Sequence, residues 1–343
     1  MHRNDEHHLL IRIDSLYSEM VAVPRSKNAY LYLAFQVLIG LLLMVYIVVC
    51  RLEVDEIASL IAKTRITYFA LAALSYFMLD VVLSYRLFYL LQEIGYGVGY
   101  LRVLVSHLGG MLIGDVTPGR SGYFLTPVFL KRIGGVRVSD AMACIFAPQG
   151  LEFLLKVGGA LAAIIYLIVK VKITHLTSLT LWVAISLLVL VGGLMLGVAW
   201  LDESYTGRLF GRIPVLKRFN EQFLTFKGSS IRIRKNIKII VALYMVGWII
   251  SGLQWYLIGG AIDLSVTYLE FFLLHPLLTT LMFLPATPAG LGIMESGTVI
   301  ALSLLGISPT AGFTFALLVR ANILLTDAVG ITAFIHTPLD LEK

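Results

Sequence analysis

Charged residues are scarce in this chain. Lys, Arg, Asp and Glu make up 14% of its 343 residues, whereas a soluble globular domain carries about 25%. Hydrophobic residues make up 58%, and the mean hydropathy is +0.87. Apolar runs of about 20 residues, the length that crosses a hydrocarbon core about 30 Å thick, recur along the sequence. We therefore expect an all-α polytopic membrane protein with no soluble domain of any size.

Cysteine and metal-ligand patterns are equally sparse. The two cysteines, Cys50 and Cys144, lie in or beside apolar runs, with no CxxC or Cys/His spacing near either. The sequence therefore predicts neither a disulfide framework nor a structural zinc site. His107 and His275 are not part of an HExxH motif or any other ligand spacing. We expect no metal and no cofactor.

The apolar runs predict six full membrane spans and four short segments. The full spans cover residues 31–49, 68–91, 141–169, 179–201, 239–262 and 311–334. The short segments cover residues 103–116, 123–130, 271–284 and 293–305. The short segments form two pairs, and each pair is interrupted by a Thr-Pro break. Two half-length segments joined by a Pro/Gly break are typical of a re-entrant helical hairpin.

Each half of the chain then contains three full transmembrane helices and one hairpin. A hairpin returns to the side from which it entered, so each half crosses the membrane three times, and the second half is inverted relative to the first. We expect one membrane domain with repeat 1 at residues 31–170 (hairpin about 103–132) and repeat 2 at residues 177–337 (hairpin about 271–305). Residues 1–30 are predicted to form a cytoplasmic tail with an amphipathic interfacial helix.

Positive charge is distributed unevenly along the chain. Residues 202–238 are rich in Lys and Arg, whereas residues 263–309 contain neither. By the positive-inside rule, the basic loop and both termini lie in the cytoplasm, and the two hairpins enter the cell membrane from opposite faces. The basic loop, in contact with anionic lipids at the cytoplasmic face, accounts for most of the net charge of +6. No nucleic-acid partner is therefore expected.

The two breaks are the most unusual stretches of the sequence. The first, residues 115–123, reads DVTPGRSGY, and the second, residues 285–292, reads PATPAGLG. A broken helix exposes unpaired backbone N–H groups and a positive helix end, here near Gly119 and Ala289. Arg120 adds a full positive charge at the first break. Together these features suit an anionic group such as a phosphate.

An arginine at this depth needs a partner or a wet cavity, because burying it in the bilayer costs about 2.5–3.5 kcal/mol on insertion scales. The candidate partners of Arg120 are Asp115, Glu152 and Glu295. A purely structural arginine, pinned by one of these acids so that the hairpin holds together, remains an alternative to a binding role.

Four other charged residues that lie within predicted spans need an explanation. Arg86 lies near the end of its span, where its side chain could reach the membrane surface. For Asp80, a structural role and a functional role fit the sequence equally well. Arg320 and Asp327 are seven residues apart on one helix face, and either a structural ion pair or a role in binding or gating fits that spacing.

Residues 117–122 and 285–295, with Arg320 in the helix that follows, resemble the two signatures of the lysylphosphatidylglycerol synthase transmembrane family. The resemblance extends over about residues 30–337. That family includes the flippase half of the bacterial multiple peptide resistance factor and many stand-alone members of unknown role. Members usually carry a glutamate where this chain has Tyr123, and an acid-arginine pair where it has Gln149 and Gly150, with Glu152 nearby.

The resemblance implies that the protein moves a lipid across the bilayer. We expect an anionic phospholipid or a polyprenyl-phosphate-linked lipid to pass through a midplane cavity between the two hairpins. The candidate substrate-binding residues are Asp115, Thr117, Gly119, Arg120, Gly122, Glu152, Thr287, Gly290, Gly292, Glu295 and Arg320. An intramembrane lipid-modifying enzyme and a non-transporting partner of a glycosyltransferase or lipid synthase remain open as alternatives, as does a homo-oligomer.

Overall fold

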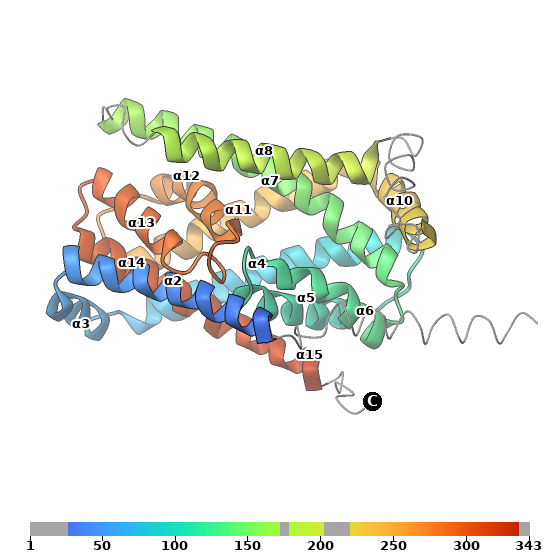
Figure 1. Cartoon of the computed structure of the whole chain (residues 1–343), viewed down its shortest axis with the longest axis horizontal. Helices are drawn as coiled ribbons and strands as arrows, with labels where there is room; N and C mark the ends of the chain where they lie inside the picture. The colour runs from blue at the N-terminus through green and yellow to red at the C-terminus, as the bar shows by residue number, and fades with distance from the viewer. Residues whose placement is uncertain (1–26, 172–177, 202–219, 336–343) are drawn as a thin grey trace, which may run out of the picture.

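The computed structural model describes residues 27–171, 178–201 and 220–335, which form one helical bundle (Figure 1). The α-helices are α2 (Lys27–Arg51), α3 (Val54–Ala62), α4 (Ile66–Glu93), α5 (Tyr100–Asp115), α6 (Thr126–Gly134), α7 (Val138–Val171), α8 (Ser178–Trp200), α10 (Asn220–Arg234), α11 (Ile237–Ala261), α12 (Tyr268–Thr279), α13 (Ile293–Leu304), α14 (Pro309–Asp327) and α15 (Ile331–Ile335). Short 3-10 helices occur at η1 (Ser121–Leu125), η4 (Thr280–Phe283) and η5 (Ala328–Gly330). The predicted interfacial helix of the N-terminal tail lies outside the described residues.

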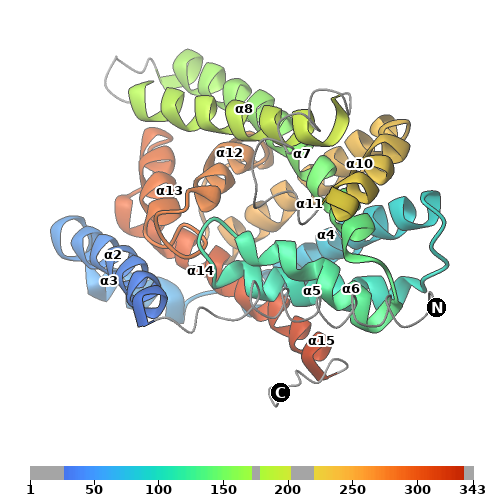
Figure 2. The same cartoon turned by 45° about the vertical axis from the view of Figure 1, so that its right-hand side comes forward.

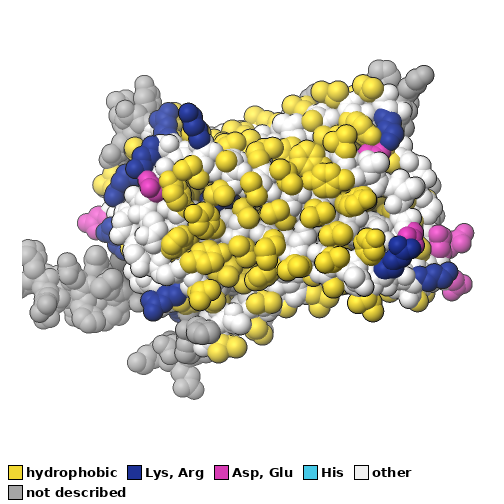
Figure 3. Space-filling model, turned by 180° about the vertical axis from the view of Figure 1, so that it is seen from behind, with side chains coloured by type: hydrophobic (Ala, Val, Ile, Leu, Met, Phe, Trp, Pro, Cys, Tyr) yellow, Lys and Arg dark blue, Asp and Glu magenta, His cyan; other side chains and the backbone are white. Residues whose placement is uncertain are grey.

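The surface of the bundle matches a membrane protein. Within the described residues, four segments are long and apolar enough to cross a bilayer: Ile66–Glu93, Val138–Lys170, Ile237–Ala261 and Pro309–Ile335. A broad band of hydrophobic side chains covers the middle of the bundle, and Lys and Arg side chains lie towards its two ends (Figure 3). The predicted all-helical membrane architecture is confirmed for the described residues.

Local sequence signals explain where the short helices begin and end. The helix α5 ends at Asp115, just before Thr117 and Pro118, because a proline disfavours the helical conformation in the residue before it. The helix α6 has a proline in its first turn and ends at Gly134, where it is capped by Gly135, whose φ of +67° lies in the left-handed region. These signals produce two helix–break–helix segments, α5 to α6 and α12 to α13.

The two helix–break–helix segments approach each other from opposite ends of the bundle and meet at their breaks (Figures 1 and 2). Pro118 and Pro288 form an antiparallel bridge. The N–H of Ala289 donates a hydrogen bond to the carbonyl oxygen of Thr117 at 3.0 Å. Stretches 170 residues apart in the sequence thus form one junction in the interior.

The helices α4, α11 and α14 pack together at the centre and are linked by buried hydrogen bonds. The Gln254 amide of α11 donates to Asn322 of α14 at 3.0 Å, and the Asn322 amide donates to the carbonyl oxygen of Phe69 in α4 at 3.0 Å. Ser75 of α4 donates to the carbonyl oxygen of Ile250 at 3.1 Å. Each bond satisfies a buried polar group, so it fixes the register between helices that are apolar over most of their length.

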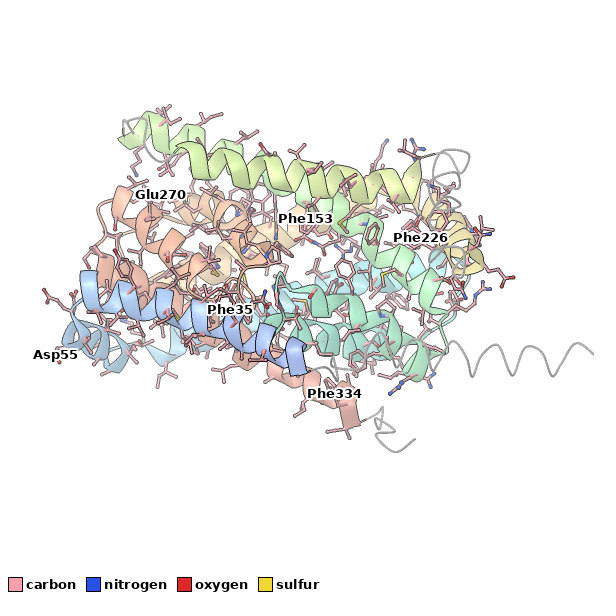
Figure 4. All side chains as sticks on the ribbon, in the orientation of Figure 1. Phe35, Asp55, Phe153, Phe226, Glu270 and Phe334 are labelled. Carbon is pink, nitrogen blue, oxygen red and sulfur yellow. The ribbon has the colours of Figure 1, made fainter. Side chains whose placement is uncertain are left out.

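Two helices were not predicted, α3 and α10. Hydropathy finds helices that are apolar all round, whereas α10 contains several charged residues and buries only one face. Phe226 of α10, labelled in Figure 4, packs against Phe146 of α7 with ring centroids 5.7 Å apart. Asp140 of α7 accepts hydrogen bonds from Ser229 of α10 and, at 2.6 Å, from Tyr96. These contacts attach part of the basic loop to the end of the bundle.

Candidate substrate-binding cavity

A cavity lies beside the junction of the two breaks. Its volume is about 170 Å³, and on this measure one water molecule needs about 10 to 15 Å³. The walls come from α4, α5, α7, α11, α12 and α14, together with the first break and the short helices η1 and η4. Phe153 of α7, which lines the cavity, lies near the middle of the bundle in Figure 4. Both halves of the chain therefore contribute to one enclosure.

Four charged side chains line the cavity: Arg86, Arg120, Glu152 and Lys156. Glu152 and Lys156 are one helical turn apart on α7 and form an ion pair of 3.0 Å. The Gln149 amide donates to the second carboxylate oxygen of Glu152 at 3.1 Å. Because this pair is neutral overall, the attraction of the wall for an anion depends on the two arginines and on how far each is balanced by acids.

Arg120 is held by acids on two helices. Its Nη2 atom lies 2.6 Å from Asp115 Oδ1 and 3.5 Å from Asp327 Oδ2. Of the three partners predicted for Arg120, the structure places Asp115 beside it and adds Asp327, which the sequence did not indicate. The other two acids, Glu152 and Glu295, pair with different cations. Arg120 thus lines the cavity with its charge already balanced.

Arg86 differs from Arg120 because two of its nitrogens have no partner. Its side chain is 2% exposed, so the prediction that it reaches the membrane surface is wrong. Its guanidinium carbon lies 4.3 Å from the centre of the Tyr244 ring, while Nε and Nη1 make no hydrogen bond. A cation over a ring face uses its charge and leaves the N–H groups in its plane available. Arg86 is therefore a residue of the cavity wall with two donors that no protein group satisfies.

The helical register of α4 was the sequence feature that could have predicted the inward position of Arg86. Leu79 and Leu83, which precede it by seven and three residues on the same face, also line the cavity. Sequence alone does not distinguish an inward-facing apolar stripe from one that faces lipid. The prediction therefore relied on the position of Arg86 near the end of its helix, which wrongly indicated that the side chain reaches the membrane surface.

The backbone of the breaks is not available to a ligand in the way the sequence suggested. The N–H of Ala289, predicted to be unpaired, donates to Thr117 of the other break. At the first break the N–H of Arg120 donates to the carbonyl oxygen of Thr117 at 3.2 Å, and that of Gly122 donates to the Thr117 hydroxyl at 2.7 Å. Buried backbone groups need partners, and here Thr117 supplies them to N–H groups of both breaks.

The predicted residues of the second signature form a buried clamp outside the cavity. Glu295 is fully buried, accepts a hydrogen bond from the N–H of Gly292 at 2.8 Å and pairs with Arg320. Arg320 also donates to the carbonyl oxygen of Ala289 at 3.4 Å. The clamp therefore attaches the second break to α14. Arg320 and Asp327 do not pair with each other, because each has a partner on a different element.

The remaining predicted residues surround the junction. Gly119 lines the cavity, and Thr287 is fully buried with no hydrogen bond to its hydroxyl. Gly290 and Gly292 have φ angles of +67° and +79°, in the region that favours glycine. Gly122 packs against the backbone of Ile113.

An aspartate cluster adjoins the cavity, consisting of Asp80, Asp115 and Asp327 around Arg120, with Tyr76 and His107. The Tyr76 hydroxyl donates to Asp327 Oδ2 at 3.1 Å. His107 Nε2 lies 3.6 Å from Asp80 Oδ1, and its Nδ1 lies 3.2 Å from the Tyr123 hydroxyl. Tyr123, which stands where related sequences usually carry a glutamate, therefore contacts a histidine.

The fold and the cavity define a class: a polytopic helical membrane protein with an arginine-lined chamber beside two joined helix breaks. The family profile described as the lysylphosphatidylglycerol synthase TM region matches residues 33–330. The chain belongs to that family, as its two signatures predicted. No curated protein matches the sequence.

Proposed function

We propose that this protein is a lipid translocase that moves a phosphate-bearing lipid between leaflets through the cavity. The single observation that carries this proposal is Arg86, a buried residue of the cavity wall whose guanidinium has two nitrogens without a hydrogen-bond partner. Guanidinium groups bind phosphate oxygens through paired, charge-assisted hydrogen bonds. Membership of a lipid-handling family makes a membrane lipid the natural source of that phosphate.

The geometry of the bundle supports alternating access. We interpret the α5–α6 and α12–α13 segments as re-entrant hairpins of two inverted repeats, because they come from opposite ends and meet at their breaks. In transporters with inverted repeats, the substrate site lies where the repeats meet, and rocking of one repeat against the other changes its exposure. The cavity has that location, with walls from both halves.

The proposed orientation places the basic end of the bundle in the cytoplasm. Lys235 and Glu93 form an ion pair of 2.9 Å at the end that carries α10, and Arg65 pairs with Asp263 at 2.9 Å at the other end. Anionic lipids would gather at the basic end and supply substrate to the cytoplasmic side.

Reconstitution of the purified protein into liposomes tests the function. Headgroup-labelled phosphatidylglycerol is placed in both leaflets, and the outer label is then destroyed chemically. We expect the protected fraction to fall in proteoliposomes compared with protein-free liposomes, because translocation exposes the inner label. A labelled diacylglycerol derivative without phosphate should show a smaller gain from the protein.

An equal protected fraction of label with and without protein contradicts the translocase. It leaves the alternative that the protein is a non-transporting partner of a glycosyltransferase or lipid synthase. Mass spectrometry of the recovered lipids separates the remaining alternative, because an intramembrane enzyme changes the mass of the lipid and a translocase does not. The variant Arg65→Gln serves as a control, since Arg65 is 53% exposed and lies in a surface ion pair far along α4 from the cavity.

A further inference from the structure

The aspartate cluster contains more negative charge than its cations balance. Two of its three carboxyl groups, those of Asp115 and Asp327, contact the single guanidinium of Arg120, and the third, that of Asp80, lies 3.6 Å from His107. Even with His107 protonated, the carboxyl groups exceed the cations by one. Asp80 and Asp327 are fully buried, and Asp115 is 6% exposed. An uncompensated charge in such a place is costly, so the cluster requires a further positive charge.

The unpaired atoms of the cluster show where that charge would bind. Both carboxyl oxygens of Asp80, one of Asp115 (Oδ2) and one of Asp327 (Oδ1) are buried without a hydrogen-bond partner. Asp115 and Asp327 approach the same nitrogen of Arg120, at 2.6 and 3.5 Å. Two carboxyl groups held this close to one donor favour the form in which one of them is protonated.

The surrounding elements leave this imbalance in place. Arg320 and Glu295, behind the cluster on α14 and α13, pair with each other. Lys156 and Glu152 pair on the opposite cavity wall. Tyr76 donates to Asp327, and Tyr123 contacts His107. Arg86 lines the same cavity but is not among the ion-pair partners of the three aspartates. None of these groups supplies the missing positive charge.

The cluster is part of the cavity wall, since Tyr76, His107 and Arg120 all line the cavity. A positive charge added to the cluster therefore raises the potential that a phosphate in the cavity would experience. Among the described residues, no group of three or more His, Cys, Asp or Glu side chains is arranged to hold a metal ion. This favours a proton over a metal cation.

We propose that Asp115 and Asp327 share one proton, taken up when an anionic headgroup enters the cavity and released when it leaves. The proton binds at one of the unpaired oxygens and forms a hydrogen bond between the two carboxyl groups, so no other group changes its bonding. By linkage, a proton that strengthens phosphate binding is itself bound more tightly when phosphate is present. This inference rests on the proposed function and adds a coupling ion to it.

Calorimetry tests the proposal on the purified full-length protein. Short-chain phosphatidylglycerol, whose phosphodiester keeps one charge near neutral pH, is titrated in buffers of different ionisation enthalpy. The dependence of the observed heat on the buffer gives the number of protons bound with the lipid. We expect uptake of up to about one proton per lipid, and affinity that falls as the pH rises.

The variant Asp327→Asn should bind the lipid with no proton uptake and with an affinity independent of pH, because the amide imitates the protonated acid. Asp115→Asn should behave alike and replaces it if Asp327→Asn does not fold. Asp263→Asn changes an exposed acid at the far end of the bundle, and should retain the uptake of the wild type. Binding without uptake in the wild type, or unchanged uptake in Asp327→Asn, overturns the proton site and leaves the translocase standing.

If the wild type binds no lipid, the proposed function fails and infrared spectroscopy decides on the proton by itself. A carboxylic-acid C=O band that changes with pH in the wild type and is lost in Asp327→Asn supports the shared proton. A band that titrates identically in the variant, or no band at all, overturns it.

Discussion

Arg86 and Arg120 are two buried arginines with different tasks. Arg120 contacts two aspartates, and so its charge is compensated within the protein. Arg86 has an aromatic face beneath it and unpaired donors beside it. Arginine inside a membrane protein is expensive unless something binds it, and the cavity gives Arg86 room for a ligand. In the proposed function, recognition of the phosphate therefore rests on Arg86, the arginine that the sequence assigned to the surface.

Replacement of Glu295 by Gln distinguishes a structural role of the clamp from a role in binding. The variant leaves Arg320 buried opposite a neutral amide, and removal of one partner of a buried ion pair costs about 3 kcal/mol or more. We expect a markedly lower thermal unfolding temperature in detergent, measured by scanning fluorimetry. Protein that remains folded should bind phosphatidylglycerol as the wild type does, because Glu295 does not line the cavity. Normal stability with weakened binding would place Glu295 in the binding site instead.

At the scale of elements, the junction of the two breaks depends on close approach of backbones. A Cβ atom on Gly122 would lie 2.6 Å from the backbone of Ile113 in α5. That distance is an overlap, so the chain between α5 and η1 would have to shift. The breaks meet through this part of the chain, and a shift here also displaces Arg120 from the cavity.

The variant Gly122→Ala is therefore expected to be destabilised by about 1–3 kcal/mol, the usual cost of overpacking. Gly158→Ala is the matched control, since Gly158 lies within α7 and a Cβ there meets no atom within 4 Å. The control should unfold at the same or a slightly higher temperature than the wild type, because alanine is the better helix former. Equal unfolding temperatures for the two variants would contradict the close approach at Gly122.

Most helices could be predicted from the sequence, because an apolar run about 20 residues long has few alternatives in a membrane protein. The predicted span 68–91 corresponds to α4, and the short segment 293–305 to α13. The helix α10 was missed because its buried face is narrow. The contacts between polar groups could not be predicted, because hydropathy contains no information about contacts between helices. Thus Asp115 was named as a partner of Arg120, whereas Asp327, more than 200 residues away, was not.

At the scale of the whole molecule, the chain has two distinct ends. The loop that contains Gly97 lies at the end with α10, where Arg232 donates to the carbonyl oxygen of Ile94 at 3.5 Å. The loop that contains Ser265 lies at the other end, next to the pair of Arg65 and Asp263. The proposed inverted repeats place these loops, each at the base of one hairpin, on opposite sides of the membrane.

Single cysteines at Gly97 and Ser265, both exposed positions, test that arrangement in a background without Cys50 and Cys144. A membrane-impermeant maleimide should label Ser265→Cys in intact cells and Gly97→Cys only in inverted vesicles. Labelling of both cysteines from the same side would refute the inverted repeats, because the two hairpins would then share one entry face.

Translocation of labelled phosphatidylglycerol by Arg86 variants tests whether Arg86 binds the phosphate of the transported lipid. Loss of charge-assisted hydrogen bonds worth about 1.5–3 kcal/mol corresponds to a decrease of roughly 10- to 150-fold. We predict that Arg86→Gln falls by such a factor, that Arg86→Lys keeps part of the activity through its charge, and that Arg65→Gln translocates at the wild-type rate. The size-exclusion profile and the unfolding temperature show whether Arg86→Gln is folded. If the folded variant translocates the lipid at the wild-type rate, Arg86 does not bind the phosphate.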